Sequence, residues 1–492
     1  MTSSRPAAPV AGVLLALALA PCSSRGGGTT PPVVTRPPPF EAECAPVGGS
    51  VGTRENGYQG IWYMNQPQAG EYRYKYSGGL ATYPQQHVPL AVYVPAVHRT
   101  FFVYGGRAPG RDRVRNVISF YDHATGRVPR PVSVQERSTN NAHFNPTLAV
   151  DRSGYLYVFA NIHGGYTALS HIYRSTCPYS ISAFTPVRTD TFSYSQVWTT
   201  DQGMVWLHTR YGVYNWRFLW WSTSPDGITW TPPRQLTRMP RGNYQISWAE
   251  GERVATAFDY HPRLTGLNGR TNLYYVESLD HGATWRTVQG RTVATPMTGI
   301  RDNPALVRDY EAEGLLVYLK DMKFDARGRP IILYLTARGH AAGPEGGPRV
   351  WRTARWTGTE WEFRVVGESD HNYDHGSLYV EADGSWRVIA PLDAGPQPYM
   401  TGGDIVTLRS TDQGQTWRRE HTLAAAPGRP YTYVRGPVNA HPGFYAMWAD
   451  GNAADPSTSD IMFGTADGRA FRLPTRMTEE AMRPSAVDAG GN

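Results

Sequence analysis

Long hydrophobic runs, clusters of basic residues and cysteines are all scarce in this chain. The apolar run at residues 10–20 is too short to span a membrane comfortably, and no second run is long enough. The formal net charge is +7, but lysine and arginine do not gather into a basic stretch, so an acidic ligand is favoured over nucleic acid. Few stretches have helical periodicity, whereas 51 glycines and 39 prolines are scattered in short clusters, which is typical of a large all-β repeat fold.

The first 49 residues are predicted to be an export signal followed by a tether. Residues 1–22 have one early arginine, no acid and then the apolar run, which is the form of a secretory signal peptide. Cys22 follows LALAP, close to a lipoprotein cleavage site, so a lipid anchor at Cys22 is an alternative, although Pro21 stands where a small residue is expected. Residues 23–49 include a Gly/Pro-rich stretch without packing capacity. The protein is therefore expected to be secreted, periplasmic or an outer-surface lipoprotein, where a disulfide between Cys44 and Cys177 can form.

One hairpin pattern recurs seven times along the rest of the chain. Each copy is a strand-like segment ending in a polar residue or glycine, preceded by a plausible partner strand. The seven segments are FFVYGG (101–106), LYVFANIH (156–163), MVWLHTR (204–210), RVATAFDYH (253–261), LLVYLKD (315–321), WRVIAPLD (386–393) and FYAMWAD (444–450). Their starts are 48 to 71 residues apart, which leaves room for two more strands in each interval. Repeats of four short strands predict a seven-bladed β-propeller over residues 50–475, followed by a frayed tail at 476–492.

A second repeat supports the propeller. SLDHGATW (278–285) and STDQGQTW (410–417) share the pattern S-x-D-x-G-x-T-W, and SPDGITW (224–230) fits it with one residue missing. These are Asp-box turns, in which Ser and Asp side chains bind the backbone and the Trp packs beneath. They are structural and say little about function.

In a propeller, the start of each inner strand and the end of the strand that follows it lie on one face. The residues at these positions should therefore ring one mouth of the molecule, and they are rich in histidine, tyrosine and arginine: His87, His143, His163, Tyr194, Arg210, Gln245, His261, Asn303, Asp321, His375 and Arg435.

Four of these residues suggest a reaction. His143 and His163 can exchange protons near neutrality, Tyr194 offers a phenol, and Arg210 offers a planar fork for a carboxylate. Such a set meets the needs of β-elimination at a uronic acid, where a carboxylate is neutralised, the C5 proton is removed and the leaving oxygen at C4 is protonated. We assign these four as catalytic. The predicted substrate-binding residues are His87, Asn145, Gln245, His261, Asn303, His375 and Arg435.

Hydrolysis is the less economical interpretation. Most glycosidases use a pair of carboxylic side chains, and the acids predicted near the mouth are few: Asp259, Asp321, Asp374 and Asp450. Each histidine taken alone is also explained by a structural role, as a hydrogen-bonded residue at a strand end.

No cofactor is required by this chemistry. The segment SDHNYDHGS (369–377) contains His371, Asp374 and His375, which are weak candidates for a structural divalent cation such as calcium or zinc, because no regular metal-ligand spacing is satisfied. The aromatic segment at 57–79 is either a sugar-stacking platform or part of the outer strands of a blade.

The sequence also resembles a known family. GYQGIWYMNQP, EYRYKYSGGL, the NAHFNP-to-NIHGG histidine pair and YDHGSLY are similar to the BNR-repeat (BNR_4-like) propeller family, which contains ulvan lyases, rhamnosyl-glucuronate lyases and α-L-rhamnosidase-like enzymes. The resemblance implies that His143, His163 and Tyr194 share base, acid and positioning roles and that Arg210 neutralises the carboxylate. This sequence departs from the family pattern at Asn140 and Asn141, where many relatives are expected to carry acids. The resemblance to the rhamnosidase-type members also makes His87 an alternative catalytic residue.

These observations together predict a secreted polysaccharide lyase that acts on a glycan containing glucuronate and rhamnose. The alternatives are an exo-α-L-rhamnosidase-type hydrolase and a propeller that binds glycans without catalysis. We expect an acidic polysaccharide or oligosaccharide as partner, no nucleic acid, no transmembrane span and a monomer.

Overall fold

The fold is all-β, as predicted. The computed structural model describes residues 1, 48–61, 63–67, 71–72, 74–78, 80, 86–164, 168–395, 398–425, 428, 430–451 and 458–487. The chain divides into two units, Met1–Phe40 and Glu41–Asn492, and every described strand lies in the second. The described residues contain no α-helix, and the helical turns whose bounds are described are short 3-10 turns: η2 (Pro95–Val97), η3 (Ala142–Phe144), η4 (Val213–Asn215), η5 (Gly266–Gly269) and η6 (Pro344–Gly346). Residues 2–47, which hold most of the predicted signal peptide and tether, lie outside the described set.

Four sheets are antiparallel meanders of four strands, each formed by one continuous part of the chain. The first contains β10 (Pro146–Val150), β11 (Leu156–Ala160), β12 (Ser170–Ser175) and β13 (Phe184–Asp190). The second contains β14 (Ser193–Thr200), β15 (Gly203–Tyr211), β16 (Arg217–Ser224) and β17 (Arg234–Gln235). The third contains β18 (Gln245–Glu250), β19 (Arg253–Tyr260), β20 (Thr271–Ser278) and β21 (Leu306–Arg308). The fourth contains β22 (Leu316–Phe324), β23 (Pro330–Ala337), β24 (Arg349–Trp356) and β25 (Trp361–Ser369).

Two larger sheets hold the two ends of the described chain. The seven-stranded sheet contains β1 (Thr53–Arg54), β2 (Gly60–Ile61), β5 (Ala91–Val94), β6 (Arg99–Arg107), β7 (Val114–Asp122), β9 (Val132–Glu136) and β32 (Thr458–Ser459). The nine-stranded sheet contains β26 (Ser377–Val380), β27 (Trp386–Ala394), β28 (Gly403–Ser410), β29 (Arg418–Ala424), β30 (Tyr431–Arg435), β31 (Ala446–Asp450), β33 (Ile461–Gly464), β34 (Ala470–Arg472) and β36 (Ser485–Val487). Two strand pairs stand apart, β3 (Tyr63–Pro67) with β4 (Tyr74–Gly78) and β8 (Val128–Pro129) with β35 (Ala481–Met482).

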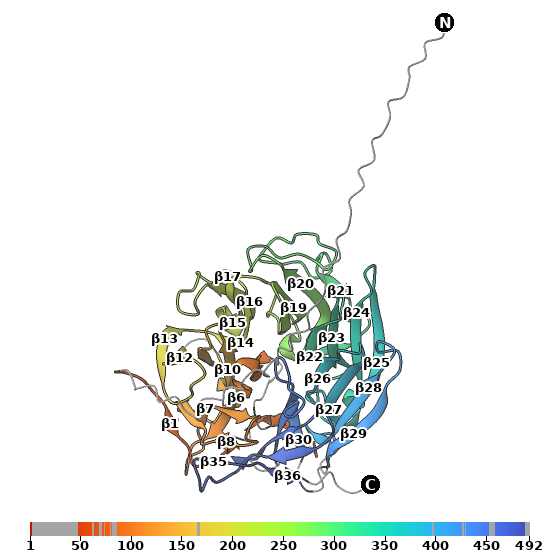
Figure 1. Cartoon of the computed structure of the whole chain (residues 1–492). Coiled ribbons are helices and arrows are strands. Elements are labelled where there is room, and N and C mark those ends of the chain that lie inside the picture. The colour runs from red at the N-terminus through yellow and green to blue at the C-terminus, as the bar shows by residue number, and fades with distance from the viewer. Residues whose placement is uncertain are drawn as a thin grey trace. The chain divides into compact units, whose positions relative to one another are not determined.

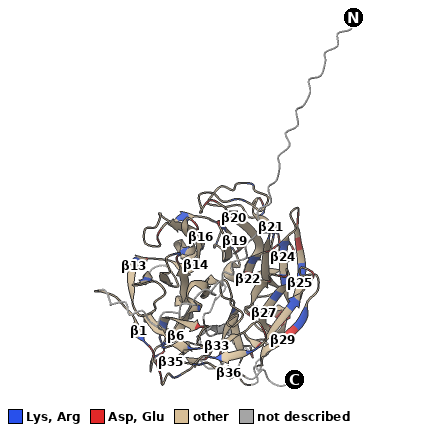
Figure 2. Ribbon diagram, viewed as in Figure 1, with Lys and Arg blue, Asp and Glu red and all other residues tan. Residues whose placement is uncertain are grey.

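The first strands of successive sheets are neighbours around a common centre (Figure 1). β10 contacts β14, β14 contacts β18, β18 contacts β22 and β22 contacts β26. The segment after β30 closes the ring against β5, because the Tyr93 N–H donates to the Val438 carbonyl and the Val438 N–H donates to the Ala91 carbonyl, both at 2.9 Å. Some of the arginines and lysines lie on outer strands such as β25 and β29 (Figure 2).

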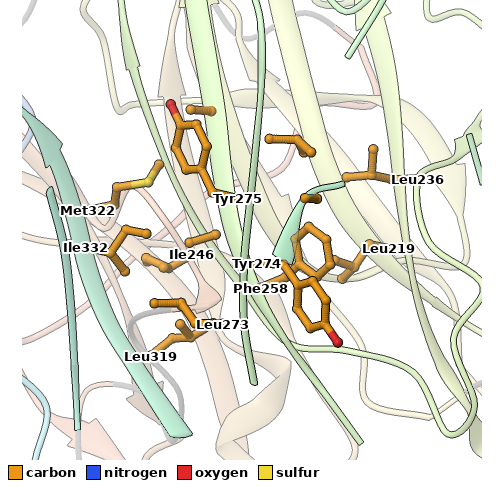
Figure 3. Packing of buried hydrophobic residues seen from close by; sticks show 14 of the residues in the cluster. Leu219, Leu236, Ile246, Phe258, Leu273, Tyr274, Tyr275, Leu319, Met322 and Ile332 are labelled. Carbon is orange, nitrogen blue, oxygen red and sulfur yellow. The ribbon is translucent and has the colours of Figure 1, made fainter. Parts of the chain in front are cut away.

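Apolar side chains fill the space between neighbouring sheets. Figure 3 shows one cluster, in which Leu219 of β16, Ile246 of β18 and Ile332 of β23 are fully buried together. Within it the rings of Phe258 and Tyr274 stack with centroids 5.0 Å apart. Packing of one sheet face on the next fixes the order of the sheets, and this order determines which loops meet at each end of the ring.

The three Ser-Asp turns close in the same way. In the turn after β20, Ser278 Oγ accepts the Gly282 N–H at 2.9 Å and Asp280 Oδ2 accepts the Thr284 hydroxyl at 2.6 Å. Trp285 beneath it is buried, 5.7 Å from the ring of Trp221. The turns at 224–230 and 410–417 have equivalent Ser and Asp hydrogen bonds. Each turn fixes the path of the chain as it leaves the third strand of a sheet.

Two sequence predictions about the strands are wrong. NPALVRD at 303–309 was expected to be the inner partner of LLVYLKD, but it contains β21, the outermost strand of the preceding sheet, and β22 is itself the inner strand. Residues 481–487 were expected to be part of a frayed tail, yet β35 pairs with β8 and β36 pairs with β34. Residues 488–492 lie outside the described residues.

Cys177 is disulfide-bonded, and the other two cysteines, Cys22 and Cys44, also lie outside the described residues.

The described part of the chain has no helix with the length and apolar character of a membrane span.

Candidate active site

The hairpin β10–β11 brings His143 and His163 together. Pro146 of β10 lies opposite Ala160 of β11, so the residues just outside these two positions meet at the open end of the hairpin. The two imidazole centroids are 4.0 Å apart and the rings are within 10° of parallel. The prediction that the two histidines are spatial neighbours is confirmed.

Asn141 determines which nitrogen of each histidine carries the proton. The backbone N–H of His143 donates to Asn141 Oδ1 at 3.0 Å, which identifies this atom as the amide oxygen. His143 Nδ1 lies 2.6 Å from the same oxygen, and because an amide oxygen only accepts, Nδ1 is protonated and Nε2 carries the lone pair. Asn141 Nδ2 donates to His163 Nδ1 at 3.1 Å, so neutral His163 carries its proton on Nε2. The pair therefore presents one acceptor nitrogen and one donor nitrogen.

Burial keeps both imidazoles uncharged at neutral pH. Desolvation holds the pKa of His143 well below its ordinary value, and the neighbouring His163, His87 and Arg217 lower it further. Burial also lowers the pKa of His163 to about 3, with contributions from Arg217 and His87. His143 Nε2 is consequently free of a proton at pH 7 and has the electronic state of a general base.

Tyr194 enters the cluster through a β-bulge at the start of β14. The register between β14 and β15 shifts between Ser193 and Gln196, and Tyr194 has a φ of 52°. A left-handed backbone is rare for an aromatic residue, and bulges of this kind redirect a side chain. The Tyr194 ring centroid lies 6.2 Å from that of His143 and 6.4 Å from that of His163. The bulge thus places the Tyr194 ring beside the histidine pair.

Three further rings extend the cluster around the centre. His87 lies 5.3 Å from Tyr194, and Tyr244 lies 5.6 Å from Tyr194 on the other side, as measured between ring centroids. His261 follows at 5.0 Å from Tyr244, with its Nε2 3.3 Å from Asp259 Oδ1. The structure therefore places His87 and His261 with the catalytic candidates, as the mouth prediction requires.

Arg217, rather than Arg210, is the arginine beside the histidine pair. The Arg210 guanidinium is held by Asp190 Oδ2 at 2.7 Å and donates to His208 Nε2 at 3.1 Å. Arg217 pairs across strands β15 and β16 with Tyr211, and its Cζ lies 5.3 Å from the Tyr211 ring centroid. The Tyr211 ring is 6.1 Å from His163. Because successive residues of a strand face opposite sides, Tyr211 faces the cluster and Arg210 faces away, and the predicted position of Arg210 is wrong.

Arg270 repeats this position one sheet further on. It lies directly before β20, as Arg217 lies at the start of β16, and its Cζ is 4.8 Å from the ring centroids of both Tyr244 and Tyr318. Its Nη2 donates to the Tyr373 hydroxyl at 3.0 Å. Asn141, Arg217 and Arg270 were not predicted from the sequence as site residues. The two arginines could have been found from the repeat pattern. In each four-stranded sheet, the start of the third strand lies on the same face of the propeller as the end of the second strand.

Several predicted binding residues lie away from the mouth. Arg435 is buried, with Nη1 3.4 Å from Asp321 Oδ1 and Nη2 donating to the Lys320 carbonyl at 3.2 Å. The Gln245 carbonyl accepts from Gln196 Nε2 at 2.9 Å. These contacts form a buried polar layer between the inner strands, so the placement of Arg435 at the mouth is wrong. Gln245 directly follows Tyr244 at the start of β18, and its role in substrate binding stays a prediction.

Asn303 and Asn145 have other surroundings. Asn303 belongs to the turn before β21, where its Nδ2 donates to the Gly299 carbonyl at 2.8 Å, so its placement at the mouth is also wrong. Asn145 is fully buried, and its side chain packs against Gly105 of the neighbouring sheet, where any Cβ would collide with Oδ1. A role for Asn145 in substrate binding stays a prediction.

The suggested metal ligands do not converge. Asp374 Oδ1 accepts the Gly402 N–H at 2.7 Å, and His371 Nδ1 accepts the Tyr373 N–H at 3.1 Å. His375 Nδ1 lies 3.3 Å from Lys320 Nζ, and its ring stacks on Tyr433 at 4.9 Å. Within the described ranges, no group of three or more His, Cys, Asp or Glu side chains is arranged to hold a metal ion.

The aromatic segment at 57–79 contributes little to the described site. Tyr58 is buried and donates its hydroxyl to the Pro129 carbonyl at 2.6 Å. Much of the rest of the segment, and nearly all of its side chains beyond Ile61, lie outside the described residues, and so do residues 81–85.

The buried neutral histidines predict acid sensitivity of the fold. His143, His163, His261 and His375 all have pKa values lowered chiefly by burial, so between pH 6.5 and about 3 the unfolded chain binds more protons than the folded one. The free energy of unfolding should therefore be highest above pH 6.5 and should decrease as the pH falls. For one histidine with the pKa of His163, the decrease at pH 5 is about 2 kcal/mol. Urea titrations at several pH values measure this slope. A His163→Gln variant should have a shallower slope, and an unchanged slope would contradict the assignment.

The sheet arrangement defines a propeller-like fold, and the cluster lies at one end of its inner strands. Over residues 125–369 the chain matches the model of the BNR repeat-containing family, which confirms the resemblance seen in the sequence. Over this region the chain is thus similar to BNR repeat-containing proteins, and its relatives include ulvan lyases.

The individual comparisons are distant in sequence and extensive in structure. An ulvan lyase designated PL25 from Pseudoalteromonas sp. (strain PLSV) is 24% identical over 317 residues, which cover 56% of this chain and 64% of that protein, slightly less than two thirds. An ulvan lyase from Alteromonas sp. (strain LOR) is 23% identical over 346 residues, which cover 58% of this chain and 70% of that protein. The solved structure of a PL25 ulvan lyase superimposes with a TM-score of 0.66 at 17% identity, over 85% of this chain and 97% of the other. That likeness establishes the fold.

Proposed function

We propose that this protein is a polysaccharide lyase that cleaves a uronate-containing glycan by β-elimination. The observation that carries the proposal is the Asn141-bridged histidine pair, which offers one basic and one donating nitrogen beside a phenol and an arginine. The names of the relatives, ulvan lyases, support the same reaction class.

Arg217 neutralises the substrate carboxylate in this mechanism. Withdrawal of negative charge from the carboxylate makes the C5 proton more acidic, and a guanidinium does this through a bidentate pair. Arg217 is close enough to contribute to the electrostatics of both His143 and His163, so a carboxylate bound there would lie next to the pair. The donating Nε2–H of His163 is suited to a second hydrogen bond to the substrate.

The proton transfers then balance without a cofactor. His143 Nε2 takes the C5 proton, the C5–H electrons form the C4–C5 double bond, and the C4–O4 bond breaks. Tyr194 donates its hydroxyl proton to the leaving O4, and transfer of a proton from His143 to the phenolate restores both groups. The products are a new non-reducing end with an unsaturated uronate and a chain with a free hydroxyl.

Hydrolysis is disfavoured by the surroundings of the cluster. Asp259 is the carboxylate that the described contacts bring into the cluster, and it is occupied by the Tyr244 N–H at 2.7 Å as well as by His261. Two carboxylic groups spaced across a scissile bond are the usual requirement for glycoside hydrolysis.

The substrate in this proposal is an acidic polysaccharide containing glucuronate and rhamnose. One related solved structure is described as bound to -[GlcA(1-4)Rha3S]-, a repeat with both sugars. A secreted, monomeric protein exported by the signal at residues 1–22 and linked through the tether at 23–49 is consistent with such a substrate. The alternative to a secreted form within this proposal is a lipoprotein with its lipid anchor at Cys22.

The sheets also support seven blades in the propeller. A single residue pair, Gly403 with Tyr431, joins the two parts of the nine-stranded sheet. One part contains β26–β29, and the other begins with β30. With the four meanders and the sheet of β5, β6, β7 and β9, this division gives seven units of about four strands.

Incubation with ulvan and with gum arabic tests the reaction. Ultraviolet absorbance of an unsaturated uronate should rise together with new reducing ends. Reducing ends without that chromophore would establish hydrolysis instead, and binding without any product would establish a non-catalytic propeller.

The tautomer assignment gives a separate prediction. In an Asn141→Asp variant, a carboxylate beside His143 raises the pKa of this imidazole, so the acid limb of kcat/KM should move up by about one to two pH units. Plateau kcat should also fall about tenfold, because a carboxylate cannot donate to His163 Nδ1. The pH profile of kcat/KM measures both effects.

Asn140→Asp is the matched control for this variant. Asn140 is exposed and its Nδ2 donates to Asp112 Oδ2 at 2.7 Å, away from the histidines, so the profile should stay that of the wild type. Equal profiles for both variants would show that Asn141 does not set the protonation of the pair.

A further inference from the structure

A cavity lies at the opposite end of the inner strands from the histidine cluster. His143, Tyr194 and Tyr244 are at or just before the starts of β10, β14 and β18, whereas the cavity is lined by the ends of the same strands, at Val150, Thr199 and Glu250. Its volume is about 640 Å³, within the range typical of small-ligand sites.

A buried polar layer lies between the two sites. Arg435 is bound to Asp321 and to the Lys320 carbonyl, and Gln196 is bound to the Gln245 carbonyl. These side chains are buried, so the cavity is a site distinct from the mouth where the proposed lyase chemistry takes place.

Aromatic rings form much of the cavity wall. Trp198 and Trp248 lie on neighbouring inner strands, with ring centroids 5.1 Å apart in an edge-to-face arrangement. On another part of the wall, Tyr379 and Tyr445 stack at 4.4 Å. Trp248 is only half-buried, so part of its indole faces the open space. Exposed indole in a concave site is suited to the apolar face of a sugar ring.

The charged groups of the cavity argue against a charged ligand. Lys323 Nζ lies 3.0 Å from each oxygen of Asp321 and 3.6 Å from the Trp248 ring centroid, so its charge is already balanced by Asp321 and would repel a cation above the indole. Glu250 is exposed at the rim, and Glu381 accepts the Tyr445 hydroxyl at 2.5 Å. The charge of Glu381 is offset by Arg387 Nη1 at 3.2 Å, so Glu250 is the carboxylate that would repel an anion, and both carboxylates can accept hydrogen bonds from hydroxyl groups.

We propose that this cavity is a second carbohydrate site that binds a neutral sugar unit through stacking on Trp248 and hydroxyl bonds to Glu250 and Glu381. The acidic mouth substrate and the neutral ligand are thus bound at opposite ends of the ring. This inference does not depend on the lyase reaction, because it rests on the cavity alone.

Affinity electrophoresis in gels containing galactomannan, xyloglucan or starch tests the site. The protein should be retarded by at least one of these neutral polysaccharides, and the retardation should be abolished by Trp248→Ala. Because loss of a half-buried tryptophan can destabilise the fold, Val380→Trp is a second variant that fills the cavity from the end of β26. It should also abolish retardation while leaving elimination activity on ulvan unchanged.

His143→Ala is the matched control, since it alters only the mouth and should be retarded like the wild type. Absence of retardation in all three neutral gels would overturn the proposal. So would retardation that survives Val380→Trp, or retardation by ulvan that Val380→Trp removes, because the cavity would then be unused or specific for an anion.

Discussion

Replacing His143 by glutamine should lower kcat/KM on ulvan by about 10³-fold, in the range expected when a general base is removed. Glutamine keeps a polar side chain of similar length but cannot take a proton. His143 Nε2 is the acceptor nitrogen of the Asn141-bridged pair, and its neutral state is maintained by burial. The measurement is the initial rate of unsaturated uronate formation at saturating and limiting substrate.

His87→Gln separates this mechanism from the rhamnosidase-type alternative. His87 contacts Tyr194 at 5.3 Å but lies outside the Asn141 bridge, so its loss should reduce kcat/KM by about tenfold or less. If His87→Gln abolishes turnover while His143→Gln retains it, the elimination mechanism is wrong and hydrolysis centred on His87 takes its place.

The sequence was sufficient to find the histidine pair because the pair depends on a local feature. A turn at DRSG between two apolar strands requires the outer ends of the hairpin to meet, whatever the rest of the fold does. The structure agrees, with Pro146 opposite Ala160 and the rings stacked beyond them. Regular spacing of such hairpins was likewise enough to predict the all-β class and to place His87 and His261 near the pair.

The sheet to which each strand belongs was harder to predict from the sequence than the hairpins were. NPALVRD and LLVYLKD are both apolar segments of the right length, and periodicity does not distinguish the outer strand of one sheet from the inner strand of the next. The structure assigns them to different sheets as β21 and β22, and this single displacement moved Asn303 from the predicted mouth to an outer turn.

The direction of a side chain was the hardest property to predict. Tyr194 reaches the cluster because a bulge interrupts β14, and no residue in FSYSQVW indicates a bulge at the sequence level. Arg210 illustrates the same difficulty, since one residue along β15 decides whether a side chain faces the cluster or Asp190. Third strands also supply the mouth with Arg217 and Arg270, at positions that were not considered.

Arg217→Met should lower kcat/KM on ulvan by about 10²- to 10³-fold, as expected for loss of a preorganised group that stabilises developing negative charge. Negative charge develops on the carboxylate in the transition state as the C5 proton leaves, so kcat should fall along with kcat/KM rather than KM rising alone. Arg210→Met is the matched control on the facing strand. It removes the ion pair with Asp190, which retains Arg188 as a partner at 2.6 Å, so kcat/KM should change by less than about tenfold. A larger loss for Arg210→Met than for Arg217→Met would restore Arg210 as the carboxylate ligand and require its guanidinium to leave Asp190 when substrate binds.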